Sequence, residues 1–547
     1  MTISRRERLL FAAIAVFGAL IITRGLVVAP NFTDAYYHLN AANRLVSGQG
    51  LTDPYLWTYI GAPERLPAPS HLYWMPLTSL SAAFGMWLLN APGNYAAAQW
   101  PFALMFAATV YAGFWLGARL GGTRRHAWTA GLLTLFSGYF TRFWGAIDTF
   151  APYAAIGSWC LVWLSLALTA IGDANGRKKF QVYGYGALAG AFAGLAHLTR
   201  ADGVLLLLVG WAAVLWPFYR DAQKRTQYIV SLRGRLVAAG VMTLAYLVIM
   251  TPWFLRNLNA IGSPLPLGGT QAIWFTEYND LFNYPPESSP ATFFADGLGN
   301  LWRTRWEALF GGGGLLAGNV GTFIAVEGLI VLTPLMLVGL WQRRREIFLR
   351  GFWLYALGVH LAMTLVFPYP GYRGGLFHSA AALVPWWAAL GVVGLDGVVD
   401  WVVRRRRHWN ARTAKGLFSA ALVLMTAYVS LTSALGNRTL SQATPSLYVE
   451  LQQTLPAGAR VMINDPAQLY YYTGFGGTVL PNALPEILPD IARRYRVDYL
   501  LLEDVTEDGR ALAAPPPLWS ILRDPPDFLT PIPLNKQGVR LYAIHVE

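Results

Sequence analysis

Two acidic residues stand at the edges of strongly apolar stretches of the chain. Asp34 follows the apolar run near the N-terminus and opens the stretch DAYYHLNAANRLVSG, and Asp148 lies in TRFWGAIDTFAPY between two later apolar runs. An ionisable group at such a depth in a membrane is costly, so it usually faces a cavity or a partner. Two carboxylates beside different helices could converge on one hydroxyl group as a general base, or on one divalent cation.

Both acids also have a purely structural interpretation. The residues after Asp34 are typical of a helix, so Asp34 could be its N-cap or a first-turn residue. Asp148 could cap the following helix, whose first turns contain Pro152. The residue types alone leave both roles open.

Two histidines extend the hypothesis of a metal site. His38 lies one helical turn after Asp34, and His71 stands in PAPSHLYWMPL. Together with Asp34 and Asp148 they could hold Mg²⁺ or Mn²⁺, because carboxylate oxygens are the ligands that these hard cations prefer. No tight spacing of metal ligands is present, so the expected cofactor is one of these two ions or none.

Three arginines at predicted outer helix ends could bind a phosphate: Arg373 in YPGYRGGLFHS, Arg200 in HLTRADG and Arg256 in FLRN. A planar guanidinium group matches the oxygens of a phosphate. Each could instead be an anchor whose charged end snorkels to the membrane surface. Arg373 is the best placed, since it lies beside Tyr372 between glycine-rich turns, where the backbone can approach a ligand.

Three further residues are weaker candidates for the site. Arg142 precedes Asp148 by a few residues, and Glu277 lies in AIWFTEYNDLFNYP, from where it could enter the site or merely be solvated. His378, one turn beyond Arg373, is expected to pack between helices.

Membrane-spanning helices are the elements that must position these residues. The 547 residues are 55% hydrophobic and only 13% charged, whereas a soluble protein of this size carries about 25% charged residues. A spanning helix needs about 20 mostly apolar residues. The predicted fold class is mainly α, a polytopic membrane protein with about eleven transmembrane helices. The predicted spans are 9–29, 98–118, 127–146, 152–171, 183–200, 203–219, 236–256, 322–341, 351–368, 375–400 and 414–435.

Basic residues predict the orientation of these helices. If residue 1 is inside and the spans alternate, every inside loop is basic: SRRER, ARLGGTRRHA, GDANGRKKF, YRDAQKRTQYIVSLRGR, QRRREIFLR and RRRRHWNARTAK. This agrees with the positive-inside rule. We therefore expect a multi-pass protein of the plasma membrane with a cytoplasmic N-terminus and an extracytoplasmic C-terminal tail. A signal peptide cleaved after Ala29 is the alternative for the N-terminus, but the charge pattern favours an uncleaved anchor.

Two domains follow from this pattern. Residues 1–435 form the predicted transmembrane domain, with outer loops 30–97 and 257–321, and residues 436–547 form a small outer domain. Its segments ARVMIND, VDYLLLED and VRLYAIHVE are typical of strands and PEILPDIARRYR of a helix, which indicates an α/β unit. The net charge of +13 suits nucleic acid or anionic lipid. Because the inside loops hold so much of this charge, we expect membrane lipids and no nucleic acid as partners.

In this context DAYYHLNAANRLVSGQGLTDP resembles the first outer loop of the GT-C glycosyltransferases, integral-membrane enzymes that use polyprenyl-phosphate-linked sugars. TRFWGAID is similar to the Arg-x-x-Gly-x-x-Asp pattern of the oligosaccharyltransferase catalytic subunit, with Arg142, Gly145 and Asp148 in the matching places. HLTRADG and PWFLRNLNAIGSPLP resemble segments of bacterial relatives of protein O-mannosyltransferases. The resemblance covers roughly residues 25–440. The WWDYG motif is absent, so recognition of an Asn-x-Ser/Thr peptide is not expected.

The resemblance implies a glycosyltransferase that moves a sugar from a polyprenyl phosphate or diphosphate to a protein, lipid or glycan acceptor outside the cytoplasm. Asp34 would be the base and Asp148 the second catalytic carboxylate, while Arg373, Arg200 and Arg256 would bind the donor phosphate. In-line attack would invert the anomeric centre. Aromatic residues around Glu277 would anchor that loop in the membrane surface or stack on sugar faces as a lid.

Two alternatives belong to other classes of protein. A transporter or a flippase for lipid-linked glycans would have no transferase activity and is expected to carry broken helices near the midplane, often in two related halves. No such internal repeat is apparent in the sequence. The other alternative is an inactive scaffold whose outer domain binds a partner.

Overall fold

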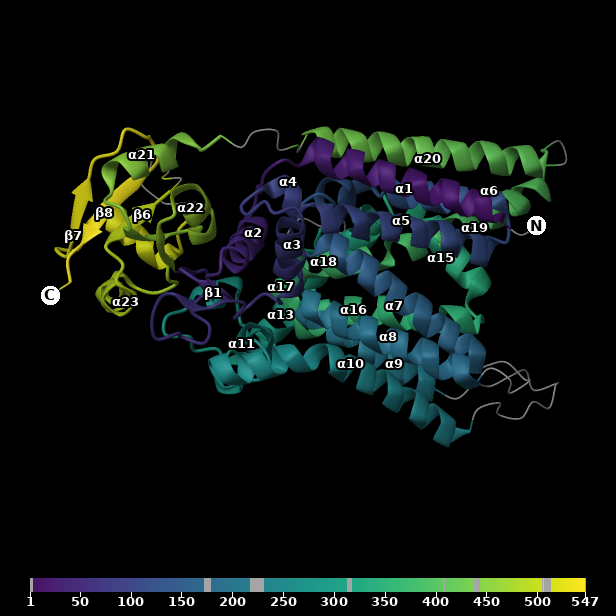
Figure 1. The fold of residues 1–547 in the computed structure, drawn as a ribbon, viewed down its shortest axis with the longest axis horizontal. Coiled ribbons are helices and arrows are strands. Elements are labelled where there is room, and N and C mark those ends of the chain that lie inside the picture. Colours follow the sequence, from purple (N-terminus) through teal and green to yellow (C-terminus); the bar gives the residue numbers. More distant parts are fainter. Residues whose placement is uncertain are drawn as a thin grey trace.

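The protein is built from a long helical part and a smaller α/β part beside one of its ends (Figure 1). The computed structural model describes residues 3–171, 179–216, 231–311, 317–406, 409–436, 438, 443–503, 505 and 513–546. The mainly helical fold class predicted from the sequence is confirmed. The N-terminus lies at the end of the helical part that is farther from the α/β part.

Helices of the membrane domain are long because their sequences are apolar over about 20 residues. Seven described segments are long and apolar enough to cross a membrane, and an eighth is bent by 89° between Gly318–Glu327 and Leu332–Arg343. The chain is therefore a multi-pass membrane protein. The seven segments are Arg5–Leu26, Tyr95–Gly121, Phe150–Ile171, Leu232–Ile261, Ile347–Val366, Pro368–Val403 and Ala411–Gly436.

The principal helices of this part follow the chain in order. They are α1 (Arg5–Leu26), α5 (Trp100–Gly121), α6 (Arg124–Leu135), α7 (Phe150–Ile171), α8 (Lys179–Thr199), α9 (Val204–Leu215), α10 (Leu232–Ile261), α15 (Leu332–Arg343), α16 (Arg350–Leu361), α18 (Leu376–Ala380), α19 (Val384–Val403) and α20 (Ala411–Gly436). Between α14 (Gly318–Gly321) and α15 lies the π-helical turn η5 (Thr322–Glu327).

Each of the eleven predicted spans overlaps a helix, but their number is not confirmed. The span 127–146 is divided between α6 and the short turn η1 (Gly138–Phe143), and the span 203–219 corresponds to the short helix α9. The span 322–341 is the bent segment. The predicted inside loops around 172–178 and 217–230 lie outside the described residues.

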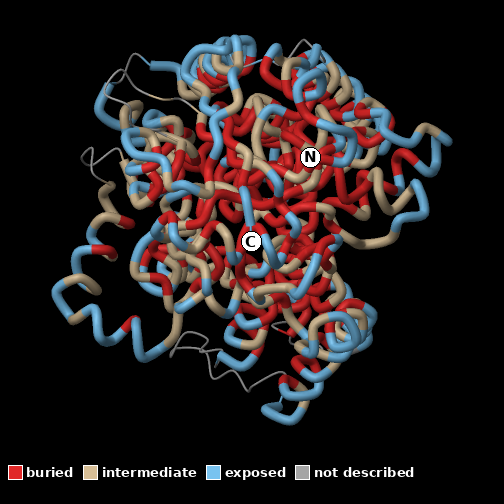
Figure 2. Tube along the Cα trace, turned by 90° about the vertical axis from the view of Figure 1, so that its left-hand side faces the viewer, coloured by how far each residue is buried: buried red, intermediate tan, exposed pale blue. Residues whose placement is uncertain are grey.

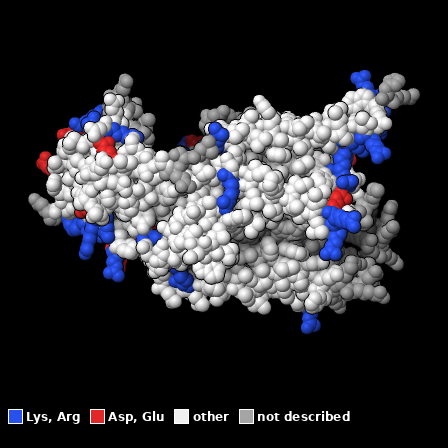
Figure 3. Space-filling model, turned by 45° about the horizontal axis from the view of Figure 1, so that its top comes forward, with Lys and Arg blue, Asp and Glu red and all other residues white. Residues whose placement is uncertain are grey.

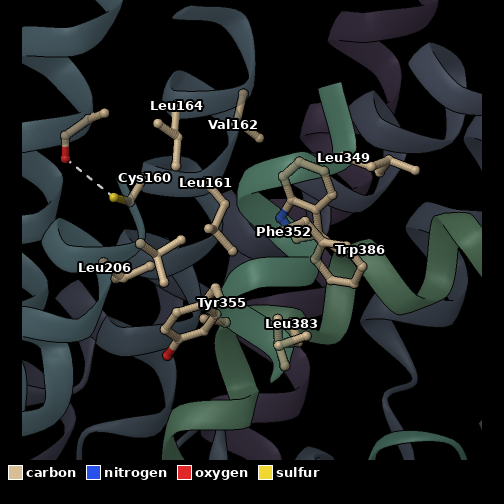
Figure 4. Close-up of a cluster of buried hydrophobic side chains, with 14 of the residues drawn as sticks. Cys160, Leu161, Val162, Leu164, Leu206, Leu349, Phe352, Tyr355, Leu383 and Trp386 are labelled. Atoms are coloured by element: carbon tan, nitrogen blue, oxygen red, sulfur yellow. Dashed lines mark hydrogen bonds between the residues drawn. The ribbon is translucent and has the colours of Figure 1, made fainter. Parts of the chain in front are cut away.

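Close packing of small and aromatic side chains holds the helices together. In the end-on view of Figure 2, buried residues fill the interior and exposed residues lie around them. Phe352 of α16 stacks on Trp386 of α19 with ring centroids 5.1 Å apart. Cys160 of α7 lies in the same cluster (Figure 4), and its thiol donates to the carbonyl of Ala189 at 3.3 Å. Each such contact contributes little to the stability of the fold, but the many contacts together contribute a large favourable energy.

The loop 30–97, predicted to be outside, contains its own short elements. After α2 (Thr33–Val46) come the strands β1 (Thr52–Asp53), β2 (Tyr55–Leu56) and β3 (Ala68–Pro69), then α3 (Leu77–Leu88) and α4 (Tyr95–Ala98). The loop 257–321 forms α11 (Leu267–Gln271), η3 (Ala272–Trp274), η4 (Tyr278–Phe282), α12 (Pro290–Ala295) and α13 (Gly297–Phe310). These two loops cover the end of the helical part that adjoins the α/β domain (Figure 1).

The C-terminal domain is the predicted α/β unit. Its elements are α21 (Ser446–Thr454), β4 (Arg460–Ile463), α22 (Pro466–Thr473), β5 (Gly476–Val479), α23 (Leu488–Tyr495), β6 (Tyr499–Leu502), β7 (Leu529–Ile532) and β8 (Arg540–Ile544). The sheet order is β2-β5-β4-β6-β8-β7, in which β2, β5, β4 and β6 are parallel and β8 and β7 are antiparallel to their neighbours.

One edge strand of this sheet, β2, comes from the loop 30–97, which no sequence feature predicted. Tyr55 of β2 stands opposite Gly477 of β5. Gly477 has a φ of +143°, and a Cβ at this position would collide with the carbonyl of Val461 in the next strand. Glycine therefore lets the backbone approach closely here, and part of the loop 30–97 joins the sheet of the C-terminal domain.

Candidate functional site

The two aspartates singled out from the sequence lie together. Asp34 is in the first turn of α2 and Asp148 is in the turn before α7. His378 of α18 joins them, and the ligand atoms of the three residues all lie within 4.8 Å of one another. The Nδ1 atom of His378 is 3.6 Å from Oδ2 of Asp148. Three segments that are far apart in the chain thus form one cluster of two carboxylates and an imidazole.

Contacts next to the cluster fix the orientation of Asp148 and His378. The backbone N–H of Thr149 donates to Oδ1 of Asp148 at 2.6 Å, and the Thr149 hydroxyl lies 2.8 Å from Nδ1 of His378. The imidazole also stacks on Phe150 with ring centroids 3.9 Å apart. Oδ2 of Asp148 is buried and has no hydrogen-bond partner among the described residues. This oxygen therefore remains available to a ligand in the cluster.

Gly145 explains how the segment that carries Asp148 comes close to the end of α1. A Cβ at Gly145 would lie 2.6 Å from the carbonyl oxygen of Thr23 near the end of α1. Gln99 joins the same segments, since its side-chain amide donates to the carbonyls of Gly145 and Val27 at 2.7 Å each. The glycine of the Arg-x-x-Gly-x-x-Asp pattern thus allows the backbone contact that carries Asp148 to the end of α1, where α2 and Asp34 begin.

Burial perturbs both carboxyl groups. Loss of water raises the pKa of Asp34, and the positive charge of Arg200 partly opposes this effect. Loss of water also raises the pKa of Asp148, and the neighbouring charge of Asp34 raises it further. Two carboxylates so close together do not both ionise readily without a cation. The pair therefore tends to hold a proton that a divalent cation could replace.

The donor set of the cluster suits a divalent cation. Two carboxylates and one imidazole are ligands for Mn²⁺ or Mg²⁺, and the unpartnered Oδ2 of Asp148 is an oxygen that such an ion would satisfy. The third ligand differs from the sequence-based hypothesis, which combined the aspartates with His38 and His71. His378 takes that place, and it also packs on Phe150 as expected of a helix-packing residue.

His38 and His71 belong to a separate hydrogen-bond network. Nδ1 of His38 and Nε2 of His71 each lie 2.9 Å from the hydroxyl of Ser79 in α3, and Nδ1 of His71 lies 2.7 Å from Ser70. Burial lowers the pKa of His38 to about 3, so this imidazole is neutral. The network joins α2 to α3 and to the segment before α3, which stabilises the helix that carries Asp34.

Arg200 forms hydrogen bonds with other residues of the protein. Its guanidinium donates to Asp202 at 3.0 Å, to Ser379 at 3.2 Å and to the carbonyl of Gly375 at 3.3 Å. Arg200 and Asp202 therefore form an ion pair. Its charge lowers the pKa of Asp34 against the effect of burial. Arg200 is therefore a source of positive charge beside the cluster. Its guanidinium donates mainly to groups of the protein itself.

Arg373 is exposed and lies over an aromatic ring next to the site. Its guanidinium carbon is 4.7 Å from the centre of the Tyr278 ring and 5.9 Å from that of Tyr372. Burial raises the pKa of Tyr278, and the negative charge of Asp34 raises it further. The Tyr278 ring therefore lies close to the cluster. Arg373 can therefore donate to a ligand that enters over Tyr278.

The structure places the other charged candidates elsewhere. Arg256 lies 4.8 Å over the ring of Trp253 and donates to the carbonyl of Leu51 at 3.1 Å. Arg142 lies over the ring of Tyr139 at 3.7 Å. Neither arginine belongs to the cluster of Asp34, Asp148 and His378.

Glu277 has a structural role in its loop. It is exposed and begins η4, where it forms a reciprocal capping arrangement with Asp280. Its carboxylate also accepts from the amide of Asn482 in the C-terminal domain at 3.3 Å. Glu277 is thus an N-cap residue that helps join the loop 257–321 to the C-terminal domain.

Aromatic side chains form a wall beside the cluster. Trp74 lies within hydrogen-bonding reach of the carboxylate of Asp34 and packs against Tyr37 in a tilted arrangement, with ring centroids 4.2 Å apart. Burial, followed by the charges of Tyr278 and Asp34, raises the pKa of Tyr73. Aromatic faces beside hydrogen-bonding groups are typical of pockets that bind a ligand with an apolar and a polar face.

Asp465 is a residue of the site's surroundings that sequence analysis missed. It is the N-cap of α22, where it accepts from the backbone N–H of Gln468 at 3.0 Å, and its other oxygen accepts from the hydroxyl of Thr33 at 2.6 Å. Its negative charge raises the pKa of Asp34. The Asp-Pro pair at the start of a helix-like stretch was a visible capping signal, but it gave no indication of the partner.

Solved structures share this architecture. The oligosaccharyltransferase AglB from Archaeoglobus fulgidus, solved with an inhibitory peptide and a dolichol-phosphate, matches with a TM-score of 0.61 at 13% identity, over 90% of this chain and 69% of AglB. ArnT from Cupriavidus metallidurans, solved with undecaprenyl phosphate, matches with a TM-score of 0.55 at 14% identity, over 98% of this chain and 97% of ArnT. The mycobacterial arabinofuranosyltransferase AftD matches with a TM-score of 0.50 at 15% identity, over 100% of this chain and 42% of AftD.

These three structures are GT-C glycosyltransferases, so the GT-C fold predicted from the sequence is confirmed. No protein-family model and no curated protein sequence matches the chain. The match to ArnT covers nearly the whole of both chains, including the C-terminal domain.

Proposed function

We propose that the chain is a glycosyltransferase that moves a sugar from a polyprenyl phosphate or diphosphate to an acceptor on the outer side of the membrane. One observation carries this proposal: Asp34, Asp148 and His378 converge where the membrane helices end and the outer domain begins. A lipid-borne donor keeps its tail in hydrocarbon and its head in water, so reactive groups for its head belong at this boundary.

Each reacting group has a counterpart in the site. Asp34 takes the proton of the acceptor hydroxyl or amine as general base, a role worth about 10²–10⁴ in rate. The acceptor then forms a bond to the anomeric carbon while the bond to the lipid phosphate breaks, with inversion, and the electron pair leaves on the phosphate. Arg373 donates to that phosphate, and Arg200 supplies further positive charge next to both carboxylates.

A divalent cation held by Asp34, Asp148 and His378 would supply further stabilisation of negative charge. The backbone N–H of Thr149 orients the carboxylate of Asp148 beside Asp34. The ring of Tyr278, which contacts Arg373 and is close enough to Asp34 to feel its charge, offers a face on which a sugar can stack. The solved AglB and ArnT structures with bound lipid phosphates support a donor of this class.

A flippase is the second candidate, because one membrane segment is broken. The 89° bend between Gly318–Glu327 and Leu332–Arg343 is a feature that transporters use. Transporters of that kind usually carry two such segments in related halves, and one bent segment occurs in the part of the chain that the structure describes. The proposal of a transferase therefore takes precedence.

Reconstituted vesicles separate the two candidates. Purified protein would receive undecaprenyl-phosphate sugars with hexose or pentose heads together with a membrane extract as acceptor source, and release of undecaprenyl phosphate would be followed. The Asp34→Asn variant should lose at least about 10²-fold in rate and keep its folded state in thermal unfolding. Asp490→Asn is the matched control, since Asp490 is exposed and pairs with Arg493 three residues further along its own helix. Unchanged release of lipid phosphate by Asp34→Asn would remove the base from the mechanism, and headgroup translocation without release would establish the flippase.

A further inference from the structure

An apolar groove lies between two membrane helices, away from the aspartate cluster. The groove has a volume of about 880 Å³ and runs between α15 and α16. The two helices form a hairpin but separate, because α15 packs on α19 and α16 packs on α9. Its walls are Leu337 and Trp341 from α15 and Trp353 and Leu357 from α16, spaced one helical turn apart on each helix. Trp387 of α19 forms its floor.

No protein element covers these walls in the described chain. The exposed fractions of Leu337, Trp341 and Leu357 are 47%, 66% and 53%. These residues lie within membrane-spanning segments, so the groove opens to lipid and not to water. A concave apolar channel along two helices fits a hydrocarbon chain much better than it fits another helix, whose side chains would need matching knobs.

The two ends of the groove differ in charge. At one end stand Arg344 and Arg345, both exposed. The guanidinium of Arg344 lies 3.8 Å from the centre of the Trp341 ring, which keeps its charge at the groove. The one acid in this turn, Glu346, pairs with Arg343 at 2.6 Å. Among the described residues Arg344 and Arg345 form no ion pair, so this end carries two uncompensated positive charges.

The other end of the groove is uncharged. Nε2 of His360 lies 3.0 Å from Oε1 of Glu327, and Nδ1 of His360 lies 2.7 Å from the carbonyl of Ala356. A carbonyl only accepts, so Nδ1 must carry a hydrogen. Nε2 and Glu327 then share a single proton, and the pair has no net charge whichever atom holds it. Trp387 donates to Oε2 of Glu327 at 2.7 Å, which satisfies the second oxygen.

The basic end of the groove and the Asp34 site lie at opposite ends of the helices. Arg343 lines one polar pocket together with Gly121, where α5 ends. Glu7 in the first turn of α1 pairs with Arg124, which begins α6 just beyond Gly121. The start of α1 therefore lies at the same end of the helices as Arg344, whereas Asp34 follows the C-terminal end of α1. A donor lipid whose phosphate is bound at Asp34 cannot place the same phosphate at Arg344. Figure 3 shows Lys and Arg gathered at the far end of the helical part.

We propose that this groove binds an anionic glycerophospholipid. Its phosphodiester lies against Arg344 and Arg345, and its acyl chains follow Trp341, Leu337 and Leu357 toward the neutral pair of Glu327 and His360. The phosphate is the part that meets the two free charges, and phosphate is a good partner for guanidinium groups. A pocket between basic helix ends on one membrane face is a suitable place for such a headgroup.

Occupancy of the groove would also support the candidate active site. Phe323 of η5 lines the groove, and η5 packs against α18, which carries His378. The bend after η5 leaves this segment without a continuous helix on its C-terminal side. A bound lipid fills the space beside η5 and so stabilises the position of α18. The lipid site itself does not depend on the proposed transferase reaction.

Native mass spectrometry of the full chain in mild detergent tests the proposal. The probe is dioleoyl phosphatidylglycerol, with dioleoyl phosphatidylcholine and undecaprenyl phosphate as competitors. The double variant Arg344→Gln/Arg345→Gln should bind phosphatidylglycerol about 30-fold more weakly, the loss expected for two arginines near an anionic headgroup. The matched control is Arg405→Gln/Arg406→Gln, because Arg405 also lies over a tryptophan, Trp401 at 3.9 Å, at a helix end outside the groove.

A second pair of variants tests the apolar part without changing charge. Leu337→Trp and Leu357→Trp fill the groove and should abolish retention of phosphatidylglycerol while both arginines remain. Only folded protein retains lipid in this measurement, and thermal unfolding of each variant in lipid-free detergent identifies any that fail to fold. Equal losses in both arginine pairs, equal retention of phosphatidylcholine, or preferred binding of undecaprenyl phosphate would each overturn the proposal.

Discussion

Thr33, the residue before Asp34, donates a hydrogen bond of 2.6 Å to Asp465 of the C-terminal domain. This contact joins the first turn of α2 to the first turn of α22, and it is strengthened by contacts further along both helices. Asn40 donates to the carbonyl of Ala467 at 2.8 Å, and Arg44 donates to the hydroxyl of Tyr470 at 3.2 Å. The helix that carries the proposed base is therefore positioned by the C-terminal domain as well as by the membrane helices.

Loss of the Thr33 hydroxyl should weaken this docking. A hydrogen bond to a charged group contributes about 1.5–3 kcal/mol, and Asp465 is partly buried, so Thr33→Val would leave its carboxylate with an unsatisfied oxygen. We expect a lower temperature of unfolding and a lower kcat with little change in the KM for the donor. Differential scanning calorimetry and the vesicle assay measure these effects. The control is Thr454→Val, because Thr454 is exposed and bonds only within its own helix. Equal effects of both variants would contradict the positioning role.

Metal binding should depend on the three clustered residues and on pH. We expect Mn²⁺ to bind the wild type and to bind Asp148→Asn and His378→Ala at least about tenfold more weakly, since each loses one ligand atom. Isothermal titration calorimetry measures the Mn²⁺ affinity of the wild type and of each variant. Burial raises the pKa of Asp34 and of Asp148, so protons compete with the ion and the affinity should fall as pH is lowered. Full Mn²⁺ affinity in Asp148→Asn would exclude the cluster as the metal site.

The same carboxyl groups predict how the stability of the cation-free protein changes with pH. Their folded-state pKa values lie above the unfolded values, so their contribution to the free energy of unfolding is fully present below the unfolded pKa of about 4. It is lost as pH rises through the raised folded-state values. Thermal unfolding with a chelator from about pH 5 to about pH 8 should show this decrease. In Asp148→Asn the decrease should be smaller, and an equal decrease would point to other groups.

Arg373 and Arg200 should respond differently to substitution. Arg373 is exposed, so Arg373→Gln should leave stability unchanged and reduce kcat/KM by about 10–100-fold, the cost of one hydrogen bond to a charged phosphate. Arg200→Gln should lower the free energy of unfolding by about 1–3 kcal/mol, because Asp202 loses its partner at 3.0 Å. Steady-state kinetics with a polyprenyl-phosphate donor and chemical unfolding distinguish the two. The roles would be reversed if Arg373→Gln were the unstable variant.

The crossing of α15 and α19 should be intolerant of larger residues. A Cβ at Gly394 would collide with the carbonyl of Leu335, and Gly339 lies against the same crossing. Gly394→Ala should therefore destabilise the protein by about 1–3 kcal/mol through overpacking. Gly416→Ala in α20 is the control, since a Cβ there meets nothing within 4 Å, and alanine should stabilise that helix slightly. Thermal unfolding in detergent compares the pair, and similar shifts would show that the crossing can relax.

Sequence patterns were most informative about elements that lie within one stretch of chain. Apolar length predicted the membrane helices, because hydropathy over about 20 residues reports directly on the thickness of a bilayer. The strand–helix order of the tail predicted its α/β fold for the same local reason. Asp34 and Asp148 stood out because carboxylates are rare at membrane depth. The break near Glu327 was not predicted, since a continuous apolar run does not show where a helix bends.

Residues whose roles depend on distant partners were assigned only by the tertiary structure. His378 had the sequence environment of a packing residue, and it reaches the carboxylates only because α18 and α7 pack together. His38 was a plausible metal ligand by its spacing from Asp34, yet Ser79 of α3 holds it. The sequence by itself determined a multi-pass membrane protein with acids at the membrane boundary, because local composition specifies those features. The tertiary structure decided which side chains share the site, because convergence depends on how separate helices pack.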